Sequence, residues 1–172
     1  INLPEDISKN EFNDIKKAFS YLPEKFIKHH IKNILFDDLG AIHGRYVNKR
    51  KKGSIILNKS IFKNKKYFRI NGEKIPMKYF TIIHEIGHML DHLHNISDND
   101  EWIKLSGWKK IKRNEKIPKN YDRYVEKRSG REIPGFKKSE WSHKDDAEFT
   151  RNYSSKNPKE DFADTFTFFV LG

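Results

Sequence analysis

The sequence HEIGH at residues 84–88 constrains this chain more than any other feature. Two histidines four residues apart lie on the same face of an α-helix, one turn apart. In that arrangement His84 and His88 can bind one metal ion, and Glu85 between them can reach a water molecule at the metal. A zinc site needs at least one further protein ligand, which the rest of the chain must supply.

The helix that carries this pattern is expected to run from about residue 76 to residue 94, with Pro76 in its first turn. Its polar side carries His84, His88 and Asp91, and its apolar side carries Ile82, Ile83, Ile86, Leu90 and Leu93. Gly87 lowers the helix propensity by about 1 kcal/mol relative to Ala. We therefore expect this small residue to admit a close neighbour.

The other elements follow from apolar periodicity and from turn residues. The pattern predicts helices over residues 8–21 and 23–31, and strands over residues 31–37, 41–47 and 54–58. A basic turn at 48–53 joins the last two strands, and Asn71-Gly72 marks another turn. Residues 97–145 suggest only short helical pieces, around Trp102, Leu105, Trp108, Ile111, Tyr121, Tyr124 and Val125.

A final helix is expected from Pro158 to about Leu171, with Asn157 as its N-cap. We expect a buried stripe of Phe162, Phe166, Phe169 and Val170 on this helix. Glu160 and Asp164 lie opposite that stripe, four residues apart, so either carboxylate could approach the metal. Glu160 also stands where a capping-box glutamate would stand, and the spacing leaves both roles open.

His94 is a rival third ligand. It follows His88 at the spacing of the metzincin pattern HExxHxxGxxH, but Asp91 occupies the position of the glycine at which that pattern turns. Met77 and Met89 are the only methionines, so no Met-turn follows downstream. We therefore expect His94, and likewise His92, to be a surface or structural residue.

The segment YSSKNPKEDFADTF, residues 153–166, resembles the second half of the active site in the anthrax lethal factor family of gluzincin metallopeptidases. The secreted bacterial Pro-Pro endopeptidases share that arrangement. The resemblance implies that Glu160 is the third zinc ligand, that the Tyr153 hydroxyl points into the site and that Asp164 supports the ligands from behind. Asp164 stands where the family usually has Glu, so the side chain at this position is shorter than in the family.

The resemblance also implies the fold and the activity. We expect an α+β, zincin-like metallopeptidase domain that spans residues 1–172. Its N-terminal part, 1–95, would hold a small mixed sheet and the HExxH helix, and its mainly helical C-terminal part, 96–172, would return Glu160 to the metal. The expected reaction is the hydrolysis of peptide bonds in a protein or peptide substrate, by a secreted, toxin-like enzyme.

In this reaction Glu85 is the expected general base and Tyr153 the expected hydrogen-bond donor to the oxyanion. Asp91, one turn beyond His88, could accept from a histidine N–H and fix its tautomer. By analogy with zincin folds, the strand at 54–58 could serve as an edge that aligns an extended peptide.

Composition narrows the alternatives. The chain has no cysteine, so a metal site must use histidines and carboxylates. The longest apolar runs fall short of the roughly 18 residues of a membrane-spanning helix. The chain begins without Met, and we expect it to be part of a longer polypeptide.

The net charge of +11 allows a second interpretation. Basic clusters at 48–52, 63–69 and 109–113 could bind an anionic polymer, but they are scattered and lack a known nucleic-acid motif, so we expect a solvated surface and no nucleic-acid partner. A third alternative is an inactive, metal-binding targeting domain of a toxin. The intact Glu85 argues against it.

Overall fold

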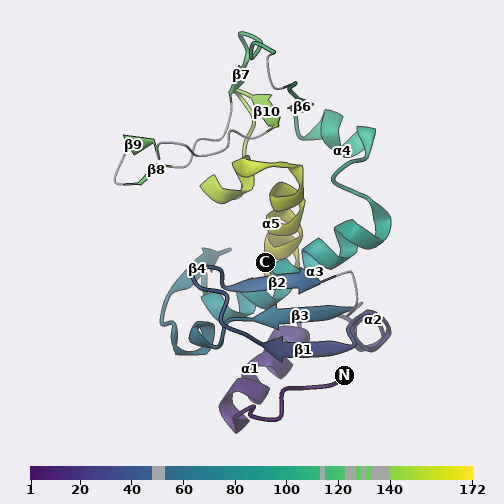
Figure 1. Cartoon of the computed structure of the whole chain (residues 1–172), viewed down its shortest axis with the longest axis vertical. Coiled ribbons are helices and arrows are strands. Elements are labelled where there is room, and N and C mark those ends of the chain that lie inside the picture. Colours follow the sequence, from purple (N-terminus) through teal and green to yellow (C-terminus); the bar gives the residue numbers. More distant parts are fainter. Residues whose placement is uncertain (48–52, 113–114, 123–126, 129–130, 133–139) are drawn as a thin grey trace.

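The computed structural model describes residues 1–47, 53–112, 115–122, 127–128, 131–132 and 140–172. The chain is a mixed α+β protein, as predicted (Figure 1). A three-stranded sheet with its helices forms one end of the molecule, and a smaller sheet with a short helix forms the other. Two helices, α3 (Met77–His94) and α5 (Pro158–Leu171), pack against each other between these ends.

The larger sheet has the strand order β1-β3-β2. Its strands are β1 (Asn33–Phe36), β2 (Gly44–Val47) and β3 (Ser54–Leu57). β1 is parallel and β2 antiparallel to β3, which confirms the predicted mixed sheet. Every residue of β3 is buried, as expected of an apolar central strand. The prediction that 54–58 forms an edge is therefore wrong, and the edge strand that contacts α3 most is β2. Residues 48–52 of the predicted turn lie outside the described residues.

Two helices and a 3-10 turn complete this part. α1 (Lys9–Phe19) begins at Ser8, whose side chain forms a reciprocal capping box with Glu11. α2 (Glu24–His30) follows Pro23, and η1 (Lys59–Lys63) follows β3. α1 buries Ile15 and Ala18 against α3 and so closes the main hydrophobic core.

A hairpin leads into α3. It pairs β4 (Tyr67–Ile70) with β5 (Glu73–Pro76). The turn lies at Asn71-Gly72, as predicted, and both residues have positive φ, 48° and 86°. α3 begins after Pro76 and ends at Asn95, which has the left-handed conformation of a helix C-cap.

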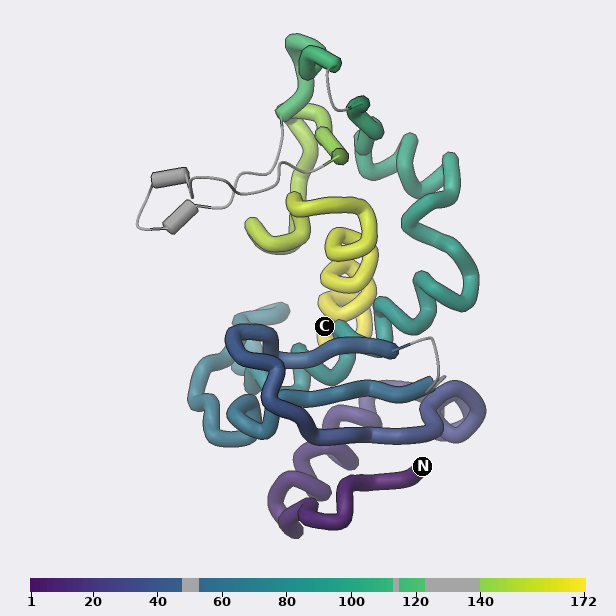
Figure 2. The backbone as a smooth tube through the Cα atoms, in the orientation of Figure 1, coloured from purple at the N-terminus to yellow at the C-terminus, as the bar shows by residue number. Residues whose placement is uncertain are grey.

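The apolar side of α3 is partly different from the prediction. Ile82, Ile83 and Ile86 are fully buried as expected, but Met89 is the next buried residue, and Leu93 is 47% exposed. Leu93 belongs to the last turn of α3, at the end of the helix that extends past the sheet (Figure 2). Among the described residues, no helix is long and apolar enough to span a membrane.

The C-terminal part is less helical than predicted. α4 (Asp100–Leu105) is followed by a sheet of order β6-β10-β7, with β6 (Trp108–Lys110), β7 (Tyr121–Asp122) and β10 (Trp141–Lys144). β8 (Lys127–Arg128) and β9 (Arg131–Glu132) form a separate pair. Trp108 and Tyr121 thus lie in strands, where aromatic residues are favoured, and not in helical pieces. Tyr124 and Val125 lie outside the described residues.

η2 (Asn152–Lys156) leads into α5, which begins as predicted: Asn157 accepts hydrogen bonds from the backbone of Lys159 and Glu160. The predicted phenylalanine stripe is wrong, because Phe169 is 84% exposed and Phe162, Phe166 and Val170 are only partly buried. The buried side of α5 carries Asp161, Ala163, Asp164, Thr167 and Leu171. Much of this side is small or polar because α5 lies close against α3.

Candidate metal centre

Three side chains from two helices converge on one point. α3 supplies His84 and His88, and α5 supplies Glu160. The Oε2 atom of Glu160 lies 3.2 Å from Nε2 of His84 and 3.3 Å from Nε2 of His88. Among the described residues, this is the group whose ligand atoms lie close enough together to hold a metal ion. The three predicted ligands are therefore brought together, although they come from distant parts of the chain.

The Glu160 side chain is only 16% exposed, and its carboxylate faces the histidines. Its Oε1 atom lies 3.4 Å from the Tyr153 hydroxyl, and its buried Oε2 atom has no hydrogen-bond partner among the described residues. A buried carboxylate oxygen without a partner is unfavourable. A cation bound between the three ligand atoms would satisfy it, whereas the capping role that the sequence left open would turn the side chain away from this point.

The convergence depends on how closely α3 and α5 approach. A Cβ atom at Gly87 would lie 2.9 Å from the Cα of Ala163 and 3.1 Å from its carbonyl oxygen. Both are backbone atoms of α5, so a side chain at position 87 would push the two helices apart. The close neighbour expected at Gly87 is confirmed, and it is the helix that carries Glu160.

Asp164 lies one turn after Glu160 and is fully buried. Its Oδ1 atom is 2.8 Å from Nδ1 of His84, a hydrogen-bond distance, although the ring N–H is not well aligned with the carboxylate. A carboxylate at Nδ1 favours the tautomer that leaves Nε2 without a proton, and Nε2 is the atom that faces Glu160. The shorter Asp therefore still reaches the histidine.

The electrostatics of this group favour a positive charge between the helices. Burial opposes the charged form of His84, but the carboxylates of Asp164 and Glu160 outweigh it and raise the pKa of His84 to about 9. Burial would likewise raise the pKa of Glu160, but its contacts with His84 and His88 hold that pKa well below its usual range. Carboxylates that stabilise a positively charged imidazole this strongly also favour a metal cation bound at the same point.

Glu85 is fixed beside the ligands. It is 5% exposed, and its Oε2 atom accepts a hydrogen bond of 2.7 Å from the backbone N–H of Tyr46 in β2. Burial raises the pKa of Glu85, against the opposing effect of the two histidines. Gly44 makes room for it, because a Cβ atom there would lie 2.9 Å from Cγ of Glu85. The edge strand thus holds Glu85 in place.

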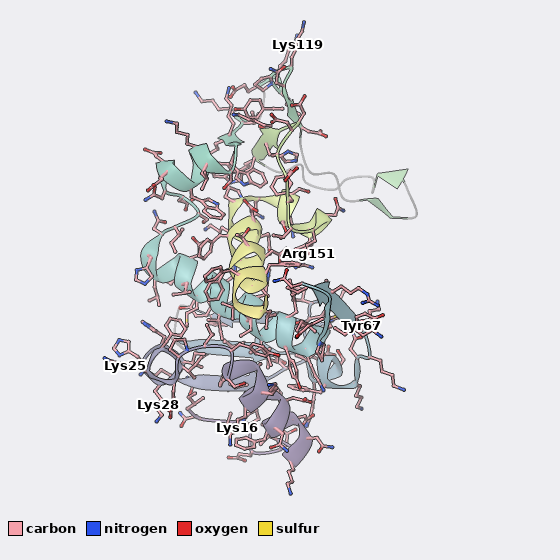
Figure 3. The ribbon with its side chains drawn as sticks, turned by 180° about the vertical axis from the view of Figure 1, so that it is seen from behind. Lys16, Lys25, Lys28, Tyr67, Lys119 and Arg151 are labelled. Carbon is pink, nitrogen blue, oxygen red and sulfur yellow. The ribbon has the colours of Figure 1, made fainter. Side chains whose placement is uncertain are left out.

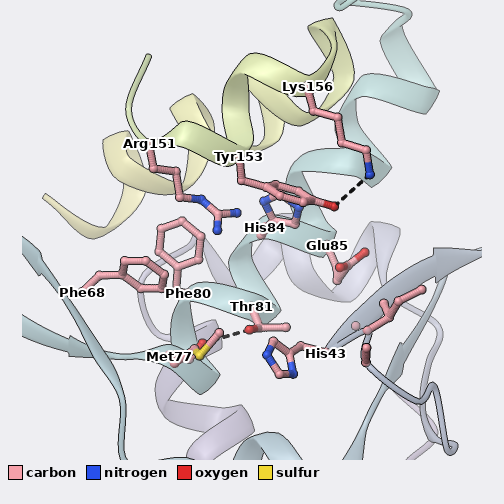
Figure 4. A pocket seen from close by; sticks show the side chains of 13 residues that line it. His43, Phe68, Met77, Phe80, Thr81, His84, Glu85, Arg151, Tyr153 and Lys156 are labelled. Carbon is pink, nitrogen blue, oxygen red and sulfur yellow. Dashed lines mark hydrogen bonds between the residues drawn. The ribbon is translucent and has the colours of Figure 1, made fainter. Parts of the chain in front are cut away.

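A pocket of about 420 Å³ opens beside His84 and Glu85 (Figure 4). Phe68, Met77 and Phe80 line its apolar part, and Arg151, Tyr153 and Lys156 lie along one side. Tyr153 is 38% exposed, and both burial and the nearby Glu160 raise the pKa of its hydroxyl. The hydroxyl therefore keeps its proton at neutral pH and can donate it in a hydrogen bond.

Asp91, the predicted histidine partner, and His94, the rival third ligand, both lie outside the converging group. Both carboxylate oxygens of Asp91 accept hydrogen bonds from Ser97, at 2.6 Å from its N–H and 2.7 Å from its hydroxyl. Asp91 thus ties the end of α3 to the following loop instead of bracing a histidine. His94 is exposed at the last position of α3 and is not part of the converging group.

Sequence reasoning missed the partners that hold the site together. Arg151 and Ser154 both donate to Asp164, and the N–H of Tyr46 donates to Glu85. A buried carboxylate is rarely unpaired, so a cation is expected near Asp164, but its burial is known only from the structure. The sequence offers Arg151, Lys156 and Lys159 within a few residues and does not choose between them.

Comparisons of the chain with protein families, with curated proteins and with solved structures find no match.

Proposed function

We propose that this chain is a zinc-dependent metalloendopeptidase of the gluzincin type, with a zincin-like fold. The observation that carries the proposal is the convergence of His84, His88 and Glu160 beside Glu85, at the edge of a pocket. Two imidazoles and one carboxylate are the ligand set of gluzincin-type catalytic zinc sites.

The spacing of the ligand atoms supports zinc. Bonds of about 2.0–2.1 Å place neighbouring ligands of a tetrahedral zinc ion about 3.3 Å apart. The Glu160 Oε2 atom lies 3.2 Å from one histidine nitrogen and 3.3 Å from the other. The unpartnered Oε2 atom fits the same interpretation. With no cysteine in the chain, nitrogen and oxygen are the donors available.

The residues around the ligands supply the remaining chemistry. A zinc ion held by His84, His88 and Glu160 would lower the pKa of a bound water molecule and would polarise a peptide carbonyl. Glu85 accepts the proton of the attacking water and passes it to the leaving amine, because burial raises its affinity for a proton. The Tyr153 hydroxyl donates a hydrogen bond to the oxyanion that develops on the carbonyl oxygen.

The surroundings of the site suit a peptide substrate. The outer edge of β2 has no strand partner among the described residues, and the N–H of Tyr46 on this edge points at Glu85. An extended peptide can pair with the free part of such an edge, which takes the place of the edge we expected at 54–58. The apolar part of the pocket, with Phe68 and Phe80, would then receive a substrate side chain.

The anionic-polymer alternative is less well supported. The lysines labelled in Figure 3 lie at opposite ends of the molecule, with Lys16, Lys25 and Lys28 at one end and Lys119 at the other. This distribution fits a solvated surface better than a single basic binding face. The anionic-polymer alternative also leaves the convergence of two histidines and Glu160 unexplained.

Cleavage of a peptide library tests the proposal. The zinc-loaded protein is expected to hydrolyse library peptides, a chelator is expected to abolish this, and added zinc is expected to restore it. Glu85→Gln should lower kcat by about 10²–10⁴-fold, because it removes the general base, and should still bind one zinc ion. Glu101→Gln makes the same change at an exposed residue of α4 and should cleave normally.

Three outcomes would contradict the proposal. Cleavage that survives the chelator would exclude a metal mechanism. Native activity of Glu85→Gln would remove the assigned base. Zinc binding without any cleavage across the library would favour the inactive targeting domain.

A further inference from the structure

Arg151 lies at the point where η2, α3 and α5 meet. Its Nε atom donates to Oδ2 of Asp164 at 2.6 Å, and a terminal nitrogen donates to Oδ1 at 2.6 Å. The guanidinium carbon lies 4.9 Å from the ring centres of both Phe80 and Tyr153. Phe68 contributes a third ring at 5.7 Å. Figure 4 shows the Arg151 side chain extending between these rings along one side of the pocket.

One atom connects this arginine to the metal ligands. Oδ1 of Asp164 accepts from Arg151 and also lies 2.8 Å from Nδ1 of His84. Ser154 fixes the other oxygen, Oδ2, with a hydrogen bond of 2.7 Å. A displacement of the guanidinium would therefore move the oxygen that faces the imidazole, while Ser154 still held the far side of the carboxylate.

Arginine has the properties that this position requires. Its planar guanidinium can donate two parallel hydrogen bonds to one carboxylate and stack on aromatic rings at the same time. Lysine would keep the charge but lose both the two-point geometry and the flat contact surface. The contacts at position 151 therefore use the shape of arginine as well as its charge.

We propose that Arg151 is a positioning residue of this site, which holds Asp164 against His84 and keeps the Tyr153 ring beside the metal ligands. The inference rests on the proposed function in that it takes His84, His88 and Glu160 as a metal site. Arg151 acts on the metal through Asp164 and His84, and on the reaction through the placement of the Tyr153 hydroxyl.

The test compares Arg151→Lys with a control variant that breaks a similar ion pair away from the metal ligands. Lys78 and Asp14 form a pair of 2.7 Å between α3 and α1, with side chains 20% and 17% exposed. Lys78→Met breaks this pair away from the metal ligands. Zinc and cobalt affinities are measured by competition with a chromophoric chelator, together with the visible spectrum of the cobalt-loaded protein and the separate values of kcat and KM.

Arg151→Lys is expected to lower the affinity for both metals by about tenfold, within the range found when a partner behind a metal ligand is lost. It should also change the cobalt spectrum and lower kcat more than it raises KM. Lys78→Met should lower the midpoint of thermal unfolding but leave the metal affinity and the spectrum as they are. Native affinity and a native spectrum in Arg151→Lys would overturn the inference.

A second variant tests the same inference if Arg151→Lys does not fold. Arg151→Gln combined with Asp164→Asn removes both charges, so no unpaired charge is left in the interior. This double variant should show the same loss of metal affinity, and native affinity would again overturn the inference. If the unaltered chain binds neither zinc nor cobalt, the proposed function fails. If it binds both and the variants bind equally well, only the role of Arg151 fails.

Discussion

The two faces of α3 are built from different chemistry. One face buries Ile82, Ile83, Ile86 and Met89 completely, in a core shared with α1 and the sheet. The other face carries His84, Gly87 and His88, and it packs against α5. The first face resembles the interior of any stable domain, whereas the second face carries two imidazoles and a glycine and meets the carboxylates of α5.

This difference separates stability from function within a single helix. The aliphatic face anchors α3, so that the opposite face can hold a buried charged group that is unfavourable without a cation. The absence of bulky side chains at Gly87 and Ala163 brings α5 close enough for Glu160 to reach the histidines. Substitutions on the two faces should therefore have separable effects on unfolding and on metal binding.

The largest change in stability is expected on the aliphatic face. Ile83→Ala should lower the free energy of unfolding by about 2–5 kcal/mol, because it leaves a cavity in the main core. The folded variant should bind zinc with native affinity. Urea unfolding of the metal-free protein and zinc competition measure the two quantities. Ile83→Val, at about 0.5–1.5 kcal/mol, is the graded control. A large loss of zinc affinity in either variant would show that the aliphatic face also determines metal binding.

Gly87→Ala tests the other face. The added methyl group would meet backbone atoms of α5, and overpacking of this kind costs about 1–3 kcal/mol of stability. Because it moves α5, the variant should also lose zinc affinity, unlike Ile83→Ala. Combining it with Ala163→Gly should restore little, since the nearest atom is the Cα of Ala163. Native zinc affinity in Gly87→Ala would show that the close packing does not set the ligand geometry.

A smaller effect is expected at the end of α3. Asp91→Asn should lower stability by about 1.5 kcal/mol, because an amide cannot accept both hydrogen bonds from Ser97 as a carboxylate does. Its zinc affinity should stay native, while Asp164→Asn should lose affinity. An equal loss of zinc affinity in the two variants would instead support the role that the sequence suggested for Asp91, which is to fix the tautomer of a histidine.

Local patterns predicted the main elements around the candidate site and two of its three candidate ligands. The helical period places His84 and His88 on one face, and the Asn157-Pro158 cap marks the start of α5. Glu160 could be singled out only through the resemblance of residues 153–166 to known metallopeptidases, because its spacing alone also fits a helix cap. Asn71-Gly72 was predictable because few other residue pairs tolerate positive φ so well.

Features that depend on contacts between distant segments could not be predicted. α5 has phenylalanines at positions 162, 166, 168 and 169, which surround more than one face of the helix. Only the packing against α3 decides that Phe169 is exposed. Asp91 lies one turn after His88, and Asp164 lies one turn after Glu160. Despite this similar spacing, Asp91 accepts hydrogen bonds from Ser97, whereas Asp164 contacts His84. The choice of Arg151 as partner depends on the path of η2, which no local pattern specifies.

In the proposed metal site, two imidazoles of α3 and one carboxylate of α5 bind the same zinc ion. Crystals of the zinc-loaded protein, measured at the zinc absorption edge, locate the ion directly through anomalous scattering. We expect one strong peak about 2.1 Å from Nε2 of His84, Nε2 of His88 and an oxygen of Glu160. A peak at His94, or a folded, zinc-loaded molecule in which Glu160 is turned away from the ion, would contradict it.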